Sequence, residues 1–213
     1  IARGPEDEAV GPYWSVTRYE DIMAIDTDHH RFSSEPFITL QNPAEDFPLP
    51  MFIAMDQPKH DIQRQTVAPV VASPSLSRMS ELIRERTQTV LNQIPLNKEF
   101  DWVNTVSVEL TTMMLATLFD FPFEDRRKLT RWSDVATASP ETGIVESETQ
   151  RRAELMECVE YFMNLWQQRV GKEGHDLITL LANGENTRDM EPMEYLGNLI
   201  LLIVGGNDTT RNS

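Results

Sequence analysis

Three runs of apolar residues at helical spacing constrain the fold of this chain more than any other feature. In each run the apolar side chains recur at steps of three and four residues, as one buried face of an α-helix requires. The runs are Met79, Leu82, Ile83, Val90, Leu91 and Ile94; Val103, Val106, Leu110, Met113, Met114 and Leu118; and Leu155, Cys158, Val159, Phe162, Leu165 and Trp166. They predict a mainly α-helical fold with its core between the helices.

The chain before Pro58 has a different character. Residues 13–17 are rich in aromatic and β-branched side chains and predict a short strand, and residues 19–26 have helical spacing. From Ser33 to Pro58, prolines interrupt a series of apolar side chains, which predicts a long apolar loop. Loops of this kind are often lids or binding segments, but a surface loop that packs its own side chains is an equally good interpretation. The N-terminal region therefore adds a minor β part.

Two further helices are predicted towards the C-terminus. Residues 176–181 suit a short helix, and Pro192 lies near the start of a last helix, where proline is tolerated. The whole chain, residues 1–213, is predicted to belong to one domain.

Composition excludes several classes of function. The 213 residues carry a net charge of −15, which argues against binding a nucleic acid or an anionic membrane. The longest apolar run, residues 199–204, is too short to be a transmembrane segment. Cys158 is the only cysteine, so an intramolecular disulfide is excluded, and its apolar helix face predicts a core position. A cytoplasmic protein is the simplest interpretation.

A cation pair is the first candidate binding site. In the segment Asp56-Gln57-Pro58-Lys59-His60-Asp61-Ile62-Gln63-Arg64, the proline predicts a helix start and Asp56 its cap. His60 and Arg64 are four residues apart and so share one helix face. Together they could hold an anion. The alternative is a solvated face with incidental charges.

The second candidate is the segment Gly205-Gly206-Asn207-Asp208-Thr209-Thr210, which directly follows an apolar run. Glycine inside a helix costs roughly 1 kcal/mol relative to alanine, so a pair needs a physical reason. The two glycines could end the helix. Otherwise a flat or bulky ligand approaches the backbone where the side chains are missing, and Asp208 and Thr209 relay protons in a locally widened helix.

The order of these features resembles the N-terminal half of the cytochrome P450 superfamily, from about Gly11 to the end of the chain. The segment Met55–Arg64 is similar to the C helix of that family, although Gln57 stands where a second proline is common. The segment Gly205–Thr210 is similar to the oxygen-binding groove of the long I helix. The resemblance implies haem b as cofactor, with His60 and Arg64 on its propionates. It places Gly205 and Gly206 beside bound O₂, and makes Asp208 and Thr209 the proton-delivering pair.

The resemblance also implies an activity, which is the insertion of one oxygen atom from O₂ into a C–H bond with two electrons. A ferredoxin and a ferredoxin reductase are the expected electron donors. The amino-acid sequences of residues 51–56 and 202–213 are similar to those of soluble bacterial hydroxylases that oxidise alkane termini. The resemblance therefore implies an n-alkane or fatty-acyl chain as the hydrophobic substrate. The implied substrate pocket consists of Phe37, Ile38, Leu40, Leu49, Phe52, Leu201 and Val204, and residues 140–148 would form a mobile lid.

The axial thiolate of this family is not found in the chain. No Phe-x-x-Gly followed by cysteine occurs, and no Glu-x-x-Arg helix leads into such a loop. Cys158 precedes the I-helix segment on a core face and is not the ligand, so these residues include no metal ligand. We therefore expect a fragment that ends inside the I helix, and the 213 residues alone to give no long-wavelength Soret band with carbon monoxide. The competing hypothesis is a non-enzymatic, acidic, all-helical binding or interaction domain.

Overall fold

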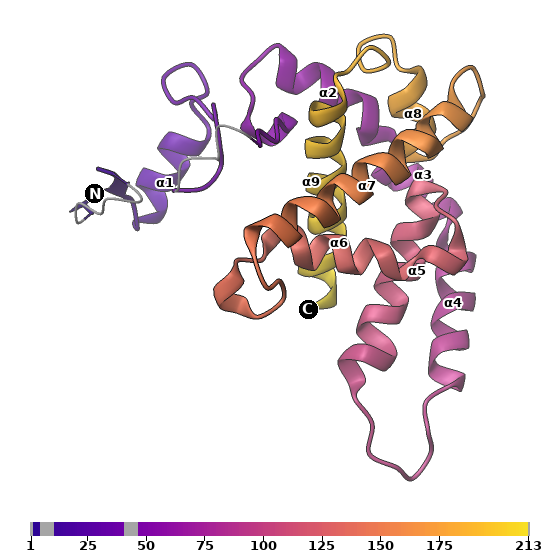
Figure 1. Ribbon diagram of the computed structural model, residues 1–213. Helices are drawn as coiled ribbons and strands as arrows, with labels where there is room; N and C mark the ends of the chain where they lie inside the picture. The colour runs from indigo at the N-terminus through magenta and orange to yellow at the C-terminus, as the bar shows by residue number, and fades with distance from the viewer. Residues whose placement is uncertain (1, 5–10, 41–46, 213) are drawn as a thin grey trace. The chain divides into compact units, whose positions relative to one another are not determined.

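The computed structural model describes residues 2–4, 11–40 and 47–212 (Figure 1). The chain divides into two units, of which the first ends at Arg64 and the second begins at Gln65. The boundary falls within one helix, α2 (Lys59–Val67). Each unit is described by itself below.

The first unit contains little regular structure. Strands β1 (Ala2–Arg3) and β2 (Trp14–Ser15) pair antiparallel, with Ala2 opposite Ser15. Helix α1 (Tyr19–Asp26) has the predicted bounds, and β2 is shorter than the predicted strand. The predicted loop is irregular over its described residues except for the 3₁₀ turn η1 (Phe52–Ala54), and residues 41–46 of it lie outside the described part.

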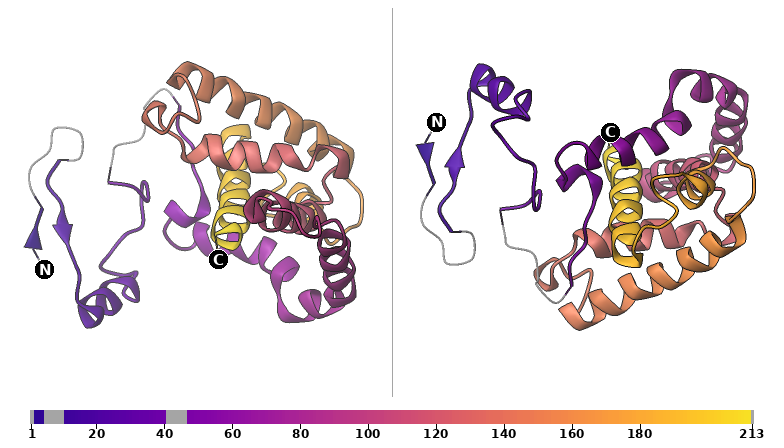
Figure 2. Two further views of the ribbon diagram at one scale, coloured as in Figure 1. Left: turned by 90° about the horizontal axis from the view of Figure 1, so that it is seen from below. Right: turned by 90° about the horizontal axis from the view of Figure 1, so that it is seen from above.

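The second unit is helical. In chain order its elements are η2 (Ala68–Val71), α3 (Ser73–Arg78), α4 (Ser80–Asn92), η3 (Val103–Ser107), α5 (Val108–Phe119), η4 (Phe123–Asp125), α6 (Arg127–Thr137), η5 (Pro140–Thr142), α7 (Glu148–Arg169), α8 (Leu177–Asn183) and α9 (Pro192–Arg211). Helix α9 packs against α5, α6 and α7 (Figure 2). The predicted mainly α-helical fold is confirmed. Of the predicted lid, residues 140–147 lie between α6 and α7, and Glu148 is the first residue of α7.

The three apolar runs are buried to different degrees. All six members of the run in α7 are buried, and Cys158 is fully enclosed, which confirms its predicted core position. Leu91 and Val103 are exposed by 45% and 50%, against the prediction. They flank the connection between α4 and α5, where α4 packs against few other helices. Periodicity alone cannot indicate how many neighbours a helix has.

Side-chain and proline caps explain where three helices begin. The Ser147 hydroxyl accepts from the amide of Gln150 at the start of α7, at 3.1 Å. The Asp176 carboxylate accepts from the amide of Thr179 at 2.8 Å, so Asp176 caps α8 rather than forming its first residue. Pro192 is the first residue of α9, as predicted.

Candidate functional site

Helix α9 continues without interruption through the glycine pair, as far as Arg211. Gly205 and Gly206 therefore do not end the helix, and the ligand interpretation of the pair gains support. The expected local widening is not present, because α9 is α-helical over its full described length. The one five-residue π-helical turn within the described ranges is η3, far from this segment in sequence.

The two glycines have different surroundings. A Cβ atom added to Gly206 would come within 2.8 Å of Leu115 Cδ1, so the absence of a side chain there lets α9 approach α5 closely. A Cβ atom at Gly205 would meet nothing within 4 Å. Gly206 is thus explained by helix packing, whereas Gly205 faces an open space.

Asp208 and Thr209, which follow Gly205 in α9, are held by different hydrogen bonds. The Thr209 hydroxyl donates to the carbonyl of Gly205 at 2.6 Å, one turn back along the helix. This bond fixes the hydroxyl oxygen on the Gly205 side of α9. Asp208 is half-buried and accepts hydrogen bonds from the next turn of α9 and from α6.

The carboxylate of Asp208 belongs to a polar cluster between α6 and α9. Its Oδ1 accepts from Arg211 Nη2 at 2.8 Å and from the hydroxyl of Ser133 at 3.3 Å. Arg211 Nη1 also donates to Asp134 Oδ1 at 3.0 Å. The sequence prediction did not include the two partners of Asp208, or the pairing of Arg211 with Asp134. The spacing of Asp208 and Arg211 could have indicated their pair, but nothing local indicates contacts to residues about 75 positions away.

The predicted cation pair lies in α2 and shares one helix face. The His60 ring is part-buried, and its Nδ1 donates to the Phe52 carbonyl at 2.8 Å. The ring of Phe52 also lies edge-on to His60, with 6.1 Å between centroids. Arg64 is exposed, and no hydrogen bond or ion pair joins its side chain to another residue within the described part of the chain. Its guanidinium is therefore available to an anion.

Asp56 does not cap α2, contrary to the sequence prediction. Its carboxylate accepts from the Ser33 hydroxyl at 2.6 Å and from the Ser34 amide at 2.9 Å. The Ser33 and Ser34 bonds lower the pKa of Asp56, and the positive charge of His29 adds to the effect. The carboxylate thus binds the start of the apolar loop to the residues that precede α2.

The predicted substrate-pocket residues differ in exposure. Ile38 and Leu40 are exposed by 57% and 59%, and Phe37 and Leu49 are half-buried. Phe52 is buried and holds His60, a role that the sequence did not indicate. In the second unit Leu201 and Val204 are half-buried, one turn and one residue before Gly205.

The described residues contain no group of three or more histidine, cysteine or acidic side chains that could hold a metal ion. Burial raises the pKa of the Cys158 thiol, which makes a thiolate at that position unfavourable. In the part of the chain that the structure describes, no helix combines the length and the hydropathy needed to cross a membrane.

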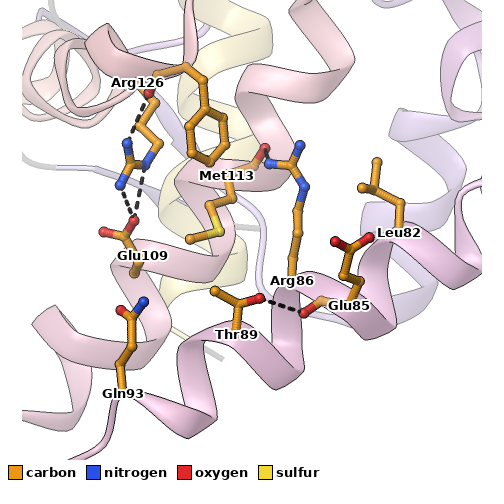
Figure 3. A pocket seen from close by; sticks show the side chains of 9 residues that line it. Leu82, Glu85, Arg86, Thr89, Gln93, Glu109, Met113 and Arg126 are labelled. Carbon is orange, nitrogen blue, oxygen red and sulfur yellow. Dashed lines mark hydrogen bonds and ion pairs between the residues drawn. The ribbon is translucent and has the colours of Figure 1, made fainter.

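One cavity of about 370 Å³ lies between α4, α5 and η4 (Figure 3). In its wall Arg126 donates to Glu109 Oε1, and Arg86 donates to the carbonyl of Met113 at 2.9 Å. None of the predicted site residues lines this cavity. The Arg126–Glu109 pair connects the residue between η4 and α6 to α5.

Comparison with known proteins defines the class of protein. No protein-family profile matches the chain. It is 30% identical to linalool 8-monooxygenase of Pseudomonas putida over 98% of the chain and 54% of that relative. Among solved structures, it is 49% identical to CYP153D17 of a Sphingomonas species, with a TM-score of 0.85, over 100% of this chain and 54% of that one. Cytochrome P450-153 of Novosphingobium aromaticivorans is 42% identical, with a TM-score of 0.87, over 99% and 53%.

The helical fold of this chain is thus shared with solved cytochrome P450 structures. The chain belongs to the cytochrome P450 superfamily. It spans about half the length of the curated relatives that it matches. Family membership implies haem b as the cofactor and favours the haem-protein hypothesis over a non-enzymatic helical domain.

Proposed function

We propose that the whole protein containing this chain is a haem-dependent monooxygenase. The bound haem would supply the activation of O₂ and the transfer of one oxygen atom to a C–H bond, with two electrons from a ferredoxin and its reductase. The observation that carries the proposal is the geometry of α9. A helix that leaves open space at Gly205 and turns a hydroxyl to the same side has room for a ligand and a proton-bearing group beside it.

The residues fit the cofactor in two respects. Gly205 leaves the space that a flat ring system needs against a helix backbone. Arg64 is an exposed guanidinium without a carboxylate partner in the described ranges, which suits a haem propionate.

His60 would bind a propionate in one particular form. Because its Nδ1–H donates to the Phe52 carbonyl, only Nε2 remains for the cofactor. Nε2 can donate to an anion only when it also carries a proton, so the ring would act as an imidazolium with that bond kept.

Proton delivery would depend on α9. The hydrogen bond from Thr209 Oγ1 to the Gly205 carbonyl would orient the hydroxyl for proton transfer along this side of α9. The Asp208 carboxylate, on the next residue, would take up protons from water and pass them on. Correctly placed groups of this kind contribute about 10²–10⁴-fold to a rate.

For the substrate we propose the end of an n-alkane or fatty-acyl chain. Phe37, Ile38, Leu40, Leu49, Leu201 and Val204 offer apolar surface without a buried charge to recognise a polar group. The similar linalool 8-monooxygenase is named for the oxidation of linalool at position 8. The resemblance of residues 51–56 and 202–213 to alkane hydroxylases supports the finer choice.

Replacement of Thr209 with alanine in the whole protein tests the proposed function. We expect the fraction of consumed reducing equivalents that appears in product to fall by about tenfold or more, because a proton route is lost. Thr209→Ser should restore most of it. Thr210→Ala is the matched control, since Thr210 is the adjacent exposed threonine. Equal coupling in the Thr209→Ala and Thr210→Ala variants would contradict the proposal.

A further inference from the structure

Arg211 is held by two carboxylates from two helices. It lies one turn after Asp208 in α9 and donates through Nη2 to Asp208 Oδ1 at 2.8 Å. Through Nη1 it donates to Asp134 Oδ1 in α6 at 3.0 Å. The Arg211 side chain is only 17% exposed and that of Asp208 25%, so solvent screens these pairs less than it would at the surface.

Both attachments of Asp208 converge on the same oxygen atom. Oδ1 accepts from Arg211 and from the fully buried Ser133, whose bond of 3.3 Å is long for a hydroxyl donor and therefore weak. Arg211 is thus the stronger hold. Oδ2 has no hydrogen-bond partner within residues 2–4, 11–40 and 47–212. The carboxylate has one fixed oxygen and one available oxygen.

Because Arg211 also pairs with Asp134, the position of its guanidinium does not depend on the charge of Asp208. A protonated Asp208 would attract a guanidinium less strongly, since a charge-assisted hydrogen bond is about twice as strong as a neutral one. Arg211 would still be paired with Asp134 and would keep its place. Asp208 could therefore gain and lose a proton without releasing the group that orients it.

We propose that Arg211 is a positioning residue for proton delivery, anchored by Asp134, which fixes Asp208 through Oδ1 and leaves Oδ2 to move the proton. Oδ2 accepts one proton from water and passes one proton on towards the oxygen-binding side, so the carboxylate is regenerated in each cycle. This inference rests on the proposed monooxygenase function. It adds residues from α6 and from the next turn of α9 to the site.

The test uses Arg211→Gln in the haem-loaded whole protein. We expect the coupled fraction to fall several-fold, but less than in Thr209→Ala, because Asp208 remains present. In a crystal structure of the variant, the Asp208 carboxylate should leave its single orientation. Asp134→Asn, which leaves the Arg211–Asp208 pair intact, should give the same changes at smaller size and provides the test if Arg211→Gln does not fold.

Arg131→Gln is the matched control. Arg131 also lies in α6 and pairs with a carboxylate of another helix, Glu154 of α7, at 2.6 Å, but it is not bonded to Asp208. Its loss should leave coupling and the Asp208 orientation unchanged. Equal uncoupling in Arg131→Gln and Arg211→Gln would overturn the inference.

The two proposals can fail separately. If Thr209→Ala uncouples the reaction while Arg211→Gln keeps normal coupling and a single Asp208 orientation, the positioning role is wrong and the proposed function stands. If neither variant changes coupling, the proposed proton route fails as well.

Discussion

The cation pair of α2 and the acid–hydroxyl pair of α9 differ in how far hydrogen bonds fix their side chains. In α2 the outer group, Arg64, is exposed and unpaired in the described part of the chain, and only His60 is held. In α9 Asp208 and Thr209 are both held by hydrogen bonds. The difference suggests that charge attraction requires little fixed geometry, whereas proton transfer requires atoms held in place.

Among these residues, loss of Arg64 should change haem binding the most. Arg64→Ala should weaken haem retention in the whole protein by about tenfold or more, since a hydrogen bond to a charged group contributes about 1.5–3 kcal/mol. The thermal stability of the haem-free protein should stay the same, because the side chain has no partner in the described residues to lose. Haem transfer to apomyoglobin measures the first quantity, and calorimetry the second.

Arg84→Ala is a suitable control for Arg64, because Arg84 is an exposed helical arginine of α4 without a recorded partner in the described ranges. It should leave haem retention unchanged. Equal haem loss in both variants would mean that net charge rather than position matters. The contrast between an unpaired α2 and a fixed α9 would then have no functional meaning.

The glycine pair offers a smaller and more local test. Gly205→Ala should stabilise the haem-free protein by about 0.5–1 kcal/mol, because alanine favours a helix and its Cβ meets no atom. The same change should weaken binding on the open side of α9. Gly206→Ala should gain less stability, since its Cβ requires Leu115 Cδ1 to move. Chemical denaturation and haem titration of both variants give the comparison.

Ligand binding by the Gly205→Ala variant shows whether the space beside Gly205 accommodates a ligand. If Gly205→Ala stabilises the protein and leaves haem and O₂ binding unchanged, the space has no ligand role. If Gly206→Ala is the only variant that impairs binding, the roles assigned to the two glycines are reversed.

The sequence predicted the local parts of the structure well. Spacing identified the helical fold, the core position of Cys158 and the shared helix face of His60 and Arg64. It also indicated that the glycine pair was unusual, but not that Gly206 faces Leu115 while Gly205 faces open space. That distinction depends on where α5 passes α9.

Contacts between distant segments could not be predicted. The bond from Ser133 to Asp208 joins residues 75 positions apart. The prediction for Asp56 failed for the same reason. Aspartate is a preferred residue at a helix N-cap, but here Ser33 and Ser34 bind the carboxylate of Asp56. A local pattern indicates which groups are available and not which partner is nearest.

The smallest expected effect concerns Asp56 and the pH. Its folded-state pKa is lowered, so its contribution to holding Ser33 and Ser34 is present above the unfolded pKa of about 3.9 and is lost as the pH falls through the lower folded value. Below neutral pH, hydrogen exchange at the Ser34 amide, corrected for its intrinsic rate, should stay slow until that range and then quicken. Asp56→Asn should give exchange without this transition. If the transition persists in Asp56→Asn, a group other than Asp56 protects the Ser34 amide. The apolar loop would then lack the charged partner that α9 has in Arg211.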